Sequence, residues 1–351
     1  MFGRIRNKFL GLITTHNTIC KRYHGHNIAS NKIIPGLTIA LFFVSIFIAV
    51  SIAIAQESER NDTLVVGVRA DAPPFSSCKN QSAICSSEKE SLEEYTGFSV
   101  DICKRIADKA VEMGITCNYI SKKISAEDRF TLLQDGTIDM LCGATTVTLE
   151  RMRITDFSLF TFVSGMSVMY TETPVFKKDG EKAVIKIGYL KKTTSENVKS
   201  ELMKKVKSEL GYGEDIHIDS NNPQDDHYTG VKNLLAGKIN VYLADREILL
   251  ALKRNHSELI VSQKYFTIEP YAIGLNMEKP ELRFAANSVL SELFGDALSN
   301  PSDMPILDLL RKHFPGSRFS KSLTNLYRSQ RLSLGSQIAN PIQQLSCPPS
   351  E

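Results

Sequence analysis

Residues 132–158 read LLQDGTIDMLCGATTVTLERMRITDFS. The first letters belong to a short helix that we predict over 128–136 and that ends at Gly136, because glycine readily adopts the left-handed conformation that terminates helices. The apolar run 138–144 then predicts a buried strand. A polar turn follows directly and carries the hydroxyl of Thr146 and the guanidinium of Arg151. This order of elements is typical of α/β proteins with parallel sheets.

The same alternation extends in both directions along the chain. Upstream, strands predicted at 64–68 and 115–120 flank a helix predicted over 97–114. Downstream, a second series begins near residue 182, with strands predicted at 183–190, 215–218 and 239–244 and helices at 194–210, 227–237 and 245–255. Strands that alternate with helices indicate parallel sheets with helices on both faces. We therefore expect an α/β protein built from two lobes.

Two segments connect the predicted lobes. The run 160–171 is a connecting strand, and after 262–276 the chain enters a helix over 281–298 that returns to the first lobe. We place lobe 1 at 62–168 and 272–315 and lobe 2 at 169–271, joined by a hinge of two strands. Residues 316–351 are a polar C-terminal tail, and we expect it to fray.

The N-terminus indicates export. Residues 1–32 are basic and polar, and the uncharged apolar run 33–55 ends in Ala53-Ile54-Ala55. A basic leader, an apolar stretch and small residues at its end are typical of a cleaved secretory signal, so residues 1–55 are predicted to be a signal peptide. The alternative is an uncleaved membrane anchor, because the run approaches the length that spans a bilayer. Either case predicts an extracytoplasmic, periplasmic protein.

Composition excludes several function classes. The 351 residues carry a formal net charge of only +3, which does not favour nucleic-acid binding, and the chain has no tryptophan on which a sugar could stack. An oxidising compartment favours disulfides. Cys78 and Cys85 could close a local loop, whereas Cys103 could pair with Cys142 or Cys117. The cysteine spacings do not match a zinc site, and we expect no cofactor and a monomer.

Polar side chains follow the predicted strands where ligands of open parallel sheets bind. Thr146 and Arg151 follow strand 138–144, and a planar guanidinium matches a carboxylate. Thr193 and Thr194 open a helix whose free N–H groups could hold an anion, although helix capping alone explains these residues better when they are taken in isolation. Asp245 ends strand 239–244 and could meet an ammonium group or simply cap the next helix.

The segments LVVGVRADAPPFS, GFSVDICKRIA, LLQDGTIDMLCGATTVTLERMRITDFS, KTTSE, NLLAGKINVYLAD and EPYAIGL occur in this order over residues 62–315. Together they resemble family 3 solute-binding proteins of amino-acid ABC transporters, most closely those that bind glutamate and aspartate. The resemblance implies the type 2 periplasmic-binding-protein fold. It also implies a ligand captured by hinge closure and delivered to an ABC transporter permease, with no catalysis.

The resemblance implies a role for each site residue. Arg151 would pair with the ligand α-carboxylate, assisted by Thr146 and by Thr193-Thr194 of the other lobe, and Asp245 would receive the α-ammonium. Three donors would surround the side-chain carboxylate of L-glutamate or L-aspartate, namely Arg69, Arg129 and His227.

Some residues depart from the family pattern. Lys192 replaces a glycine, and Ala144 and Ala126 replace serines, which leaves another polar ligand such as glutamine open. An enzyme similar to cyclohexadienyl dehydratases is a second alternative, with Glu127 or Asp128 as its general acid. A membrane-anchored sensor domain is a third.

Overall fold

The computed structural model describes residues 63–79, 85, 91–172, 177–179, 182–211, 216–295, 304–317 and 321–333. The predicted signal peptide or anchor at 1–55 lies outside these residues. Within them, no helix has the length and apolar character needed to cross a membrane.

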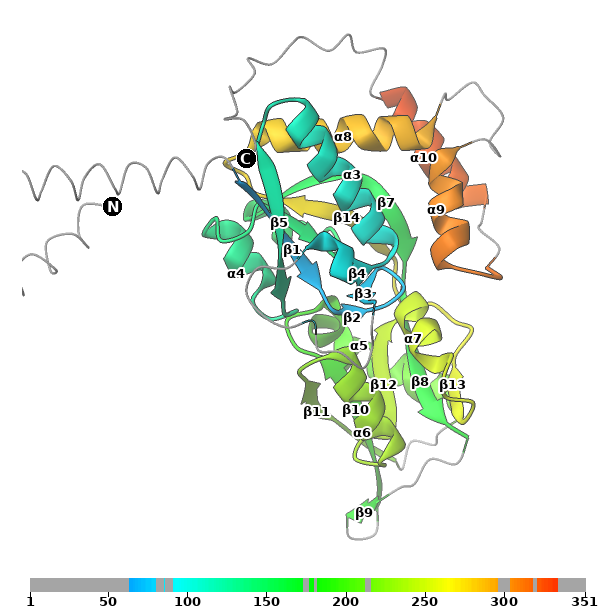
Figure 1. Ribbon diagram of the computed structural model, residues 1–351. Helices are drawn as coiled ribbons and strands as arrows, with labels where there is room; N and C mark the ends of the chain where they lie inside the picture. The colour runs from blue at the N-terminus through cyan, green and yellow to red at the C-terminus, as the bar shows by residue number, and fades with distance from the viewer. Residues whose placement is uncertain are drawn as a thin grey trace, which may run out of the picture. The chain divides into compact units, whose positions relative to one another are not determined.

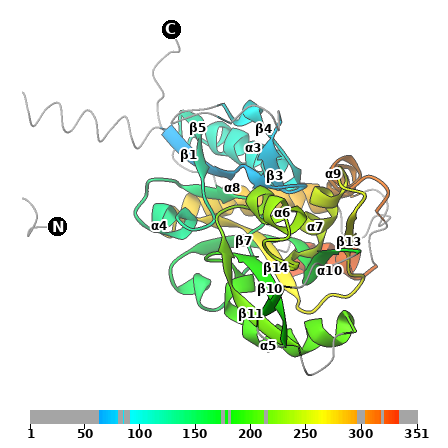
Figure 2. The same ribbon diagram turned by 90° about the horizontal axis from the view of Figure 1, so that it is seen from below.

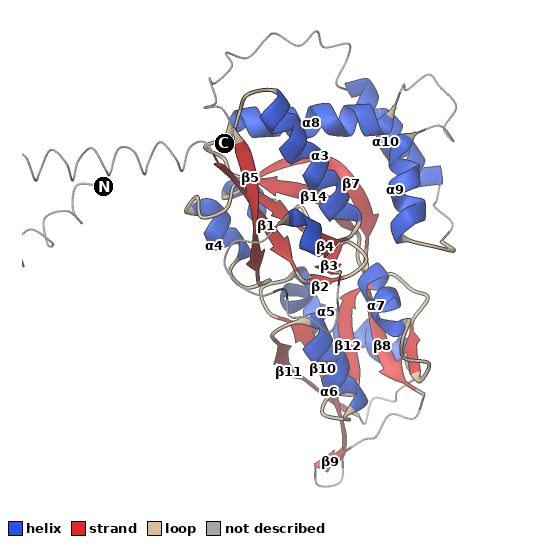
Figure 3. Ribbon diagram, in the orientation of Figure 1, coloured by secondary structure: helices blue, strands red, loops and turns tan. Residues whose placement is uncertain are grey.

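The described residues form two separate mixed sheets, drawn in red in Figure 3. We call the part built on the first sheet lobe 1. Its strands follow the order β5-β1-β6-β14-β7. They are β1 (Thr63–Arg69), β5 (Asn118–Ile124), β6 (Met140–Cys142), β7 (Asp156–Ser164) and β14 (Glu269–Leu275). The neighbouring helices are α3 (Phe98–Glu112), α4 (Arg129–Gln134), α8 (Pro280–Phe294), α9 (Pro305–His313) and α10 (Lys321–Ser333).

Short elements complete lobe 1. A small sheet contains β2 (Asp71–Ala72), β3 (Ser76–Cys78) and β4 (Tyr95–Thr96). Two short 3₁₀ helices are η1 (Leu92–Glu94) and η2 (Arg151–Arg153).

Lobe 2 is built on the second sheet, whose order is β11-β10-β12-β8-β13, with β9 paired to β10. Its strands are β8 (Met166–Thr171), β9 (Lys177–Asp179), β10 (Lys182–Leu190), β11 (His217–Gln224), β12 (Val241–Asp245) and β13 (Leu259–Val261). Its helices are α5 (Thr194–Glu209), α6 (His227–Leu235) and α7 (Arg246–Lys253).

Strand alternation places helices on both faces of each sheet, as predicted. In β6, Met140 and Cys142 join the core on the α3 side, whereas Leu141 packs with Leu133 of α4. In β12, Tyr242 packs toward α6 and α7, whereas neighbouring side chains pack toward α5. Figure 2 shows α5 on the side of the second sheet opposite α6 and α7.

The sheets are not wholly parallel, which corrects the prediction. β1 runs parallel to β5 and β6, and β10 runs parallel to β11 and β12. The strands next to the crossings, β14 in lobe 1 and β8 in lobe 2, are antiparallel to their neighbours. The reason is that a strand that crosses directly from the other lobe enters its sheet without the helical crossover that parallel pairing needs.

The chain crosses between the sheets at two places (Figure 1). The first crossing is Gly165, between the end of β7 and the start of β8, earlier than the boundary expected at 168. A Cβ there would lie 2.2 Å from the carbonyl oxygen of Thr267 on the second crossing, so only glycine lets the two segments run this close. The return crossing enters β14 at Glu269.

The C-terminal tail does not fray over 321–333, contrary to expectation, because α10 covers the edge of the first sheet. Gln330 accepts from the N–H of Phe160 (2.6 Å) and donates to its carbonyl oxygen (3.0 Å), which satisfies backbone groups of the edge strand β7. Tyr327 is fully buried, stacks on Phe294 and donates its hydroxyl to the Thr161 carbonyl oxygen. Apolar and hydrogen-bonding contacts therefore hold this helix in place.

Two disulfides join described residues. Cys78 pairs with Cys85, as the local loop suggested, and Cys103 of α3 pairs with Cys142 of β6. The choice between Cys142 and Cys117 for Cys103 is thus settled by the packing of α3 on the sheet.

Removing the longer disulfide should destabilise the protein more than removing the shorter one. The loops span 39 and 7 residues. Chain entropy predicts a loss of about 4 kcal/mol for Cys103→Ala/Cys142→Ala and about 2.5 kcal/mol for Cys78→Ala/Cys85→Ala. Urea unfolding without reductant measures both, and equal losses would contradict the argument.

Tyr327→Ala should lower the free energy of unfolding by about 3 kcal/mol or more, because it leaves a cavity beside Phe294 and frees a buried carbonyl. Asn325→Ala, at an exposed position of the same helix, is the matched control and should leave stability within about 0.5 kcal/mol. Both are measured by urea unfolding; an unchanged Tyr327→Ala protein would show that α10 does not pack on lobe 1.

Candidate ligand-binding site

A small cavity lies between the two lobes and gathers every site residue predicted from the sequence. Its volume is about 20 Å³, enough for roughly one water molecule. Lobe 1 lines it with Arg69, Arg129, Ala144, Thr146 and Arg151, and lobe 2 with Thr193, Thr194, Ser195, His227, Ala244, Asp245 and Ile248. An amino acid needs more space, so the lobes must separate to admit one.

Arg151 lies at the start of η2, in the turn that follows β6. Its Nη1 donates to the carbonyl oxygen of Thr146 (2.7 Å), and its backbone N–H donates to the hydroxyl of Thr148 (3.2 Å). The guanidinium lies over the Phe130 ring at 4.8 Å. Burial lowers the pKa of Arg151, and the negative charges of Glu269 and Asp245 offset this effect only in part.

Arg129 begins α4 and is only 2% exposed. Its guanidinium also lies over the Phe130 ring, 5.0 Å from the centroid, and its Nε has no hydrogen-bond partner among the described residues. Burial, followed by the positive charges of Arg151 and Arg69, lowers its pKa well below the usual value. Arg129 is therefore a buried cation that needs an anion.

Arg69 differs from expectation, because an acid of the protein already pairs with it. Its Nε and Nη2 donate to the two carboxylate oxygens of Asp71 at 2.7 and 2.8 Å. Both residues are shielded, with side-chain exposures of 2% and 14%. The expectation that Arg69 offers its full charge to a ligand is corrected, since Asp71 compensates that charge.

His227 begins α6 on the opposite lobe. Its backbone N–H donates to Asp71 (3.1 Å), and its ring Nδ1 shares a hydrogen bond of 2.9 Å with the Tyr242 hydroxyl. Burial lowers its pKa to about 4. The ring is therefore neutral at pH 7 and adds no positive charge to the cavity.

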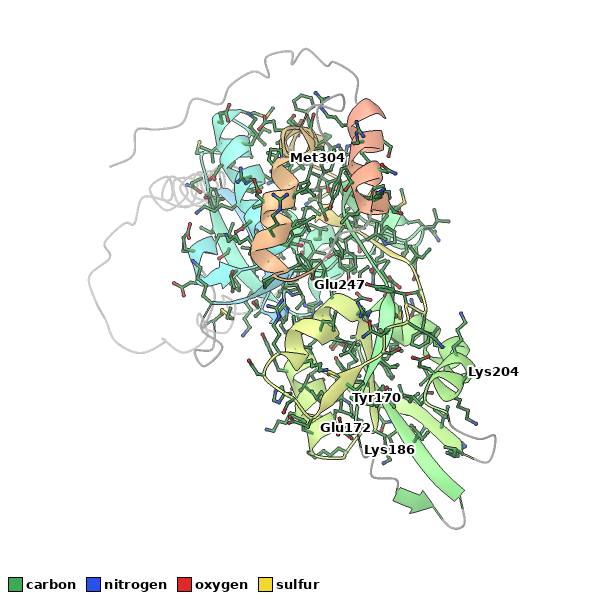
Figure 4. The ribbon with its side chains drawn as sticks, turned by 90° about the vertical axis from the view of Figure 1, so that its right-hand side faces the viewer. Tyr170, Glu172, Lys186, Lys204, Glu247 and Met304 are labelled. Carbon is green, nitrogen blue, oxygen red and sulfur yellow. A yellow bond between two sulfur atoms is a disulfide. The ribbon has the colours of Figure 1, made fainter. Side chains whose placement is uncertain are left out.

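Asp245 ends β12 and contributes an acidic group to the cavity lining of lobe 2. The Tyr271 hydroxyl donates to its Oδ2, whereas its buried Oδ1 has no partner among the described residues. Burial, and then the negative charge of Glu269, raise its pKa to about 7. Glu247 adds to this effect, and Figure 4 shows it near the boundary between the lobes.

The start of α5 forms the remaining wall. Thr193 precedes the helix, and its hydroxyl donates to the Leu190 carbonyl oxygen (2.7 Å) rather than capping the helix. Lys192, which replaces the family's glycine, adopts φ 55°, so the left-handed turn is kept at some cost in strain. The first N–H groups of a helix lack intrahelical partners, which makes this end suitable for an anion.

Sequence reasoning missed Asp71 and Tyr271. Asp71 lies two residues after Arg69, a spacing that places both side chains on one face of an extended chain and could have signalled the pair. Tyr271 comes from β14, distant in sequence from Asp245, and no local signal connects them.

The acids proposed for a dehydratase do not reach the cavity. Glu127 and Asp128 are exposed, do not line it, and Asp128 accepts from the Ser125 hydroxyl at 2.8 Å. Among the described residues, no group of acids, histidines and cysteines could hold a metal ion.

Comparisons with known proteins place this geometry in a family. Curated relatives include the ABC transporter glutamine-binding protein of Bacillus subtilis, 26% identical over 67% of this chain and 78% of the relative. Another is the glutamate/aspartate import solute-binding protein of Salmonella typhimurium, 26% identical over 66% of this chain and 72% of the relative.

Solved structures show the same fold at low identity. A mutant of ArgBP from T. maritima superposes with a TM-score of 0.55 and 20% identity, over 74% of this chain and 98% of that one. An ancestral arginine-binding protein bound to glutamine gives 0.54 and 23%, over 72% and 98%. These neighbours establish the type 2 periplasmic-binding fold. Since the sequence model of bacterial extracellular solute-binding proteins, family 3, matches residues 64–299, the chain belongs to that family.

Proposed function

We propose that this protein captures L-glutamate or L-aspartate outside the cytoplasm and delivers it to the permease of an ABC importer. The observation that carries the proposal is the charge pattern of one cavity. Arg129 and Arg151 have no ion-pair partner within 4.0 Å among the described acids, and Asp245 has an unpartnered oxygen. An acidic amino acid supplies two carboxylates and one ammonium, which match these three groups.

Each group has a role in this proposal. Arg151 binds the α-carboxylate, aided by Thr146 and by the N–H groups of Thr194 and Ser195 at the start of α5. Asp245 binds the α-ammonium, and Arg129 binds the side-chain carboxylate. A neutral side chain leaves Arg129 buried without an anion, which opposes its binding.

Closure of the lobes follows from where these groups lie. The arginines that bind the carboxylates are in lobe 1, whereas Asp245 and the first N–H groups of α5 are in lobe 2, so a bound ligand ties the lobes together. Gly165 and the segment before Glu269 are the crossings about which the lobes would rotate. Closure expels water and strengthens each charged contact.

Curated relatives support two ligand classes. Some carry names for glutamine binding, whereas others are named for glutamate/aspartate import, including a protein of Escherichia coli that is 32% identical over 31% of this chain and 33% of the relative. The unpaired Arg129 favours the acidic ligands over glutamine.

Substitutions of the two arginines should distinguish binding of the α-carboxylate from binding of the side-chain carboxylate. Arg151→Ala should lower the affinity for every α-amino acid by at least about 100-fold. Arg129→Met should lower the affinity for glutamate and aspartate by a similar factor, but the affinity for glutamine by only a few-fold. Calorimetry with glutamate, aspartate, glutamine and arginine measures these affinities.

The matched control is Arg153→Ala, an exposed arginine in the same turn as Arg151, which should change no affinity. Equal affinity of wild type and Arg129→Met for glutamate would refute the acidic ligand, and binding of glutamate by Arg151→Ala at wild-type strength would refute the α-carboxylate site.

Asp245 should make the stability of the unliganded protein fall between pH 4 and pH 7. An unfolded aspartate ionises near pH 3.9, whereas the buried carboxyl ionises near 7, so over this window only the unfolded state loses its proton. Above pH 7 the buried carboxyl of Asp245 is ionised in the folded protein, and the full cost in stability is present. Asp245→Asn removes it and should be more stable than wild type by up to about 4 kcal/mol at pH 8, with little difference at pH 4.

Urea unfolding of both proteins across this range gives the difference directly, because the titration of other groups cancels. A stability difference that does not vary with pH would show that Asp245 titrates as an ordinary exposed carboxyl.

A further inference from the structure

The carboxylate of Asp71 accepts hydrogen bonds from both lobes. It receives two hydrogen bonds from Arg69, which lines the cavity, and one from the backbone N–H of His227, on the opposite lobe. A guanidinium of lobe 1 and an N–H at a helix start of lobe 2 are the kind of partners that hold a ligand carboxylate between closed lobes.

The ion pair makes Arg69 independent of the ligand. Arg69 holds the pKa of Asp71 well below its usual range, so the carboxylate stays ionised at every physiological pH. A buried cation whose charge is compensated within the protein imposes no penalty on a neutral ligand. Arg129 remains the cation whose charge a ligand side chain must compensate.

The position of Asp71 is set by the fold rather than by local flexibility. It lies in β2, which pairs with β3, and the following Phe75 is fully buried against Phe162, Tyr271 and Phe314. The backbone N–H of Phe75 donates to the Ala72 carbonyl oxygen (3.0 Å) and tightens this turn. The small sheet and this turn therefore fix the backbone of Asp71 next to Arg69.

We propose that Asp71 is a specificity-determining residue, a built-in counter-ion for Arg69 that limits the side-chain subsite to one uncompensated guanidinium and so weakens discrimination of acidic ligands from their amides. The inference rests on the proposed function. It predicts that wild type prefers glutamate over glutamine by less than Arg69 and Arg129 together would otherwise impose.

The test compares the affinities for glutamate and glutamine, measured by calorimetry, in wild type and Asp71→Asn. The substitution keeps the size of the side chain and removes its charge, so that a glutamine ligand would leave two buried guanidinium groups uncompensated. The ratio of the glutamine to the glutamate dissociation constant should rise by at least about tenfold.

A double variant isolates the pair. In Arg69→Met/Asp71→Asn both charges are absent, so there is no guanidinium for Asp71 to compensate, and the ratio should return to within about threefold of wild type. Asp225→Asn is the matched charge control, because Asp225 pairs with Lys191 (2.7 Å) on the surface with 78% side-chain exposure. It changes the net charge equally and should leave the ratio unchanged.

The outcomes separate the inference from the proposed function. A ratio that is equal in wild type and Asp71→Asn shows that the pair is only structural, and an equal rise in Asp225→Asn shows a general charge effect; either result overturns the inference. If Asp71→Asn does not fold, the double variant Arg69→Met/Asp71→Asn provides the test. A ratio of its glutamine to glutamate dissociation constants that differs from wild type by tenfold or more also overturns the inference. If wild type prefers glutamine, the proposal of an acidic ligand is refuted, whereas the change of the ratio in Asp71→Asn still tests the role of Asp71. If wild type binds neither ligand, both the proposed function and the inference on Asp71 are refuted.

Discussion

Burial of positive charge without an equal number of acids is the constraint on which the site depends. Three guanidinium groups, those of Arg69, Arg129 and Arg151, lie close enough for their charges to act on the pKa of Arg129, and only Arg69 has an ion-pair partner within the described residues. A buried cation without a counter-ion is costly. The folded protein therefore carries an electrostatic cost that a bound anion would relieve, and in the proposed function affinity and selectivity both follow from this unpaired charge.

The fold brings these charges together through the ends of its strands and helices. Arg69 ends β1, Arg151 follows β6, and Asp245 ends β12, so each lobe delivers its polar groups at one edge of a sheet. The two crossings hold these edges opposite one another. Aromatic packing around Phe75 and the covering of β7 by α10 make lobe 1 a firm support for the arginines.

Acidic groups of the site act in opposite ways. Asp71 is ionised and neutralises Arg69, whereas Asp245 has no cation within ion-pair distance among the described residues, and its pKa is raised to about 7. A ligand ammonium would stabilise its ionised form. The same side-chain type thus serves as an internal counter-ion for Arg69 and, in the proposed function, as the partner of a ligand ammonium in the cavity. Environment, not chemical identity, separates these roles.

The amino-acid sequence alone determined the α/β class, the two series of strands and helices and the polar residues at the strand ends, because hydrophobic periodicity and strand-end chemistry are local properties. All eight predicted site residues line the cavity. Only the tertiary structure decided the partners of the charged groups: the ion pair of Arg69 with Asp71, and the hydrogen bonds that Asp71 accepts from the His227 N–H and Asp245 from the Tyr271 hydroxyl. It also decided the Cys103–Cys142 disulfide, the antiparallel strands at the crossings and the place of α10. Each of these, apart from the Arg69–Asp71 pair, joins residues far apart in the chain, and their energies depend on burial, which a linear pattern does not contain.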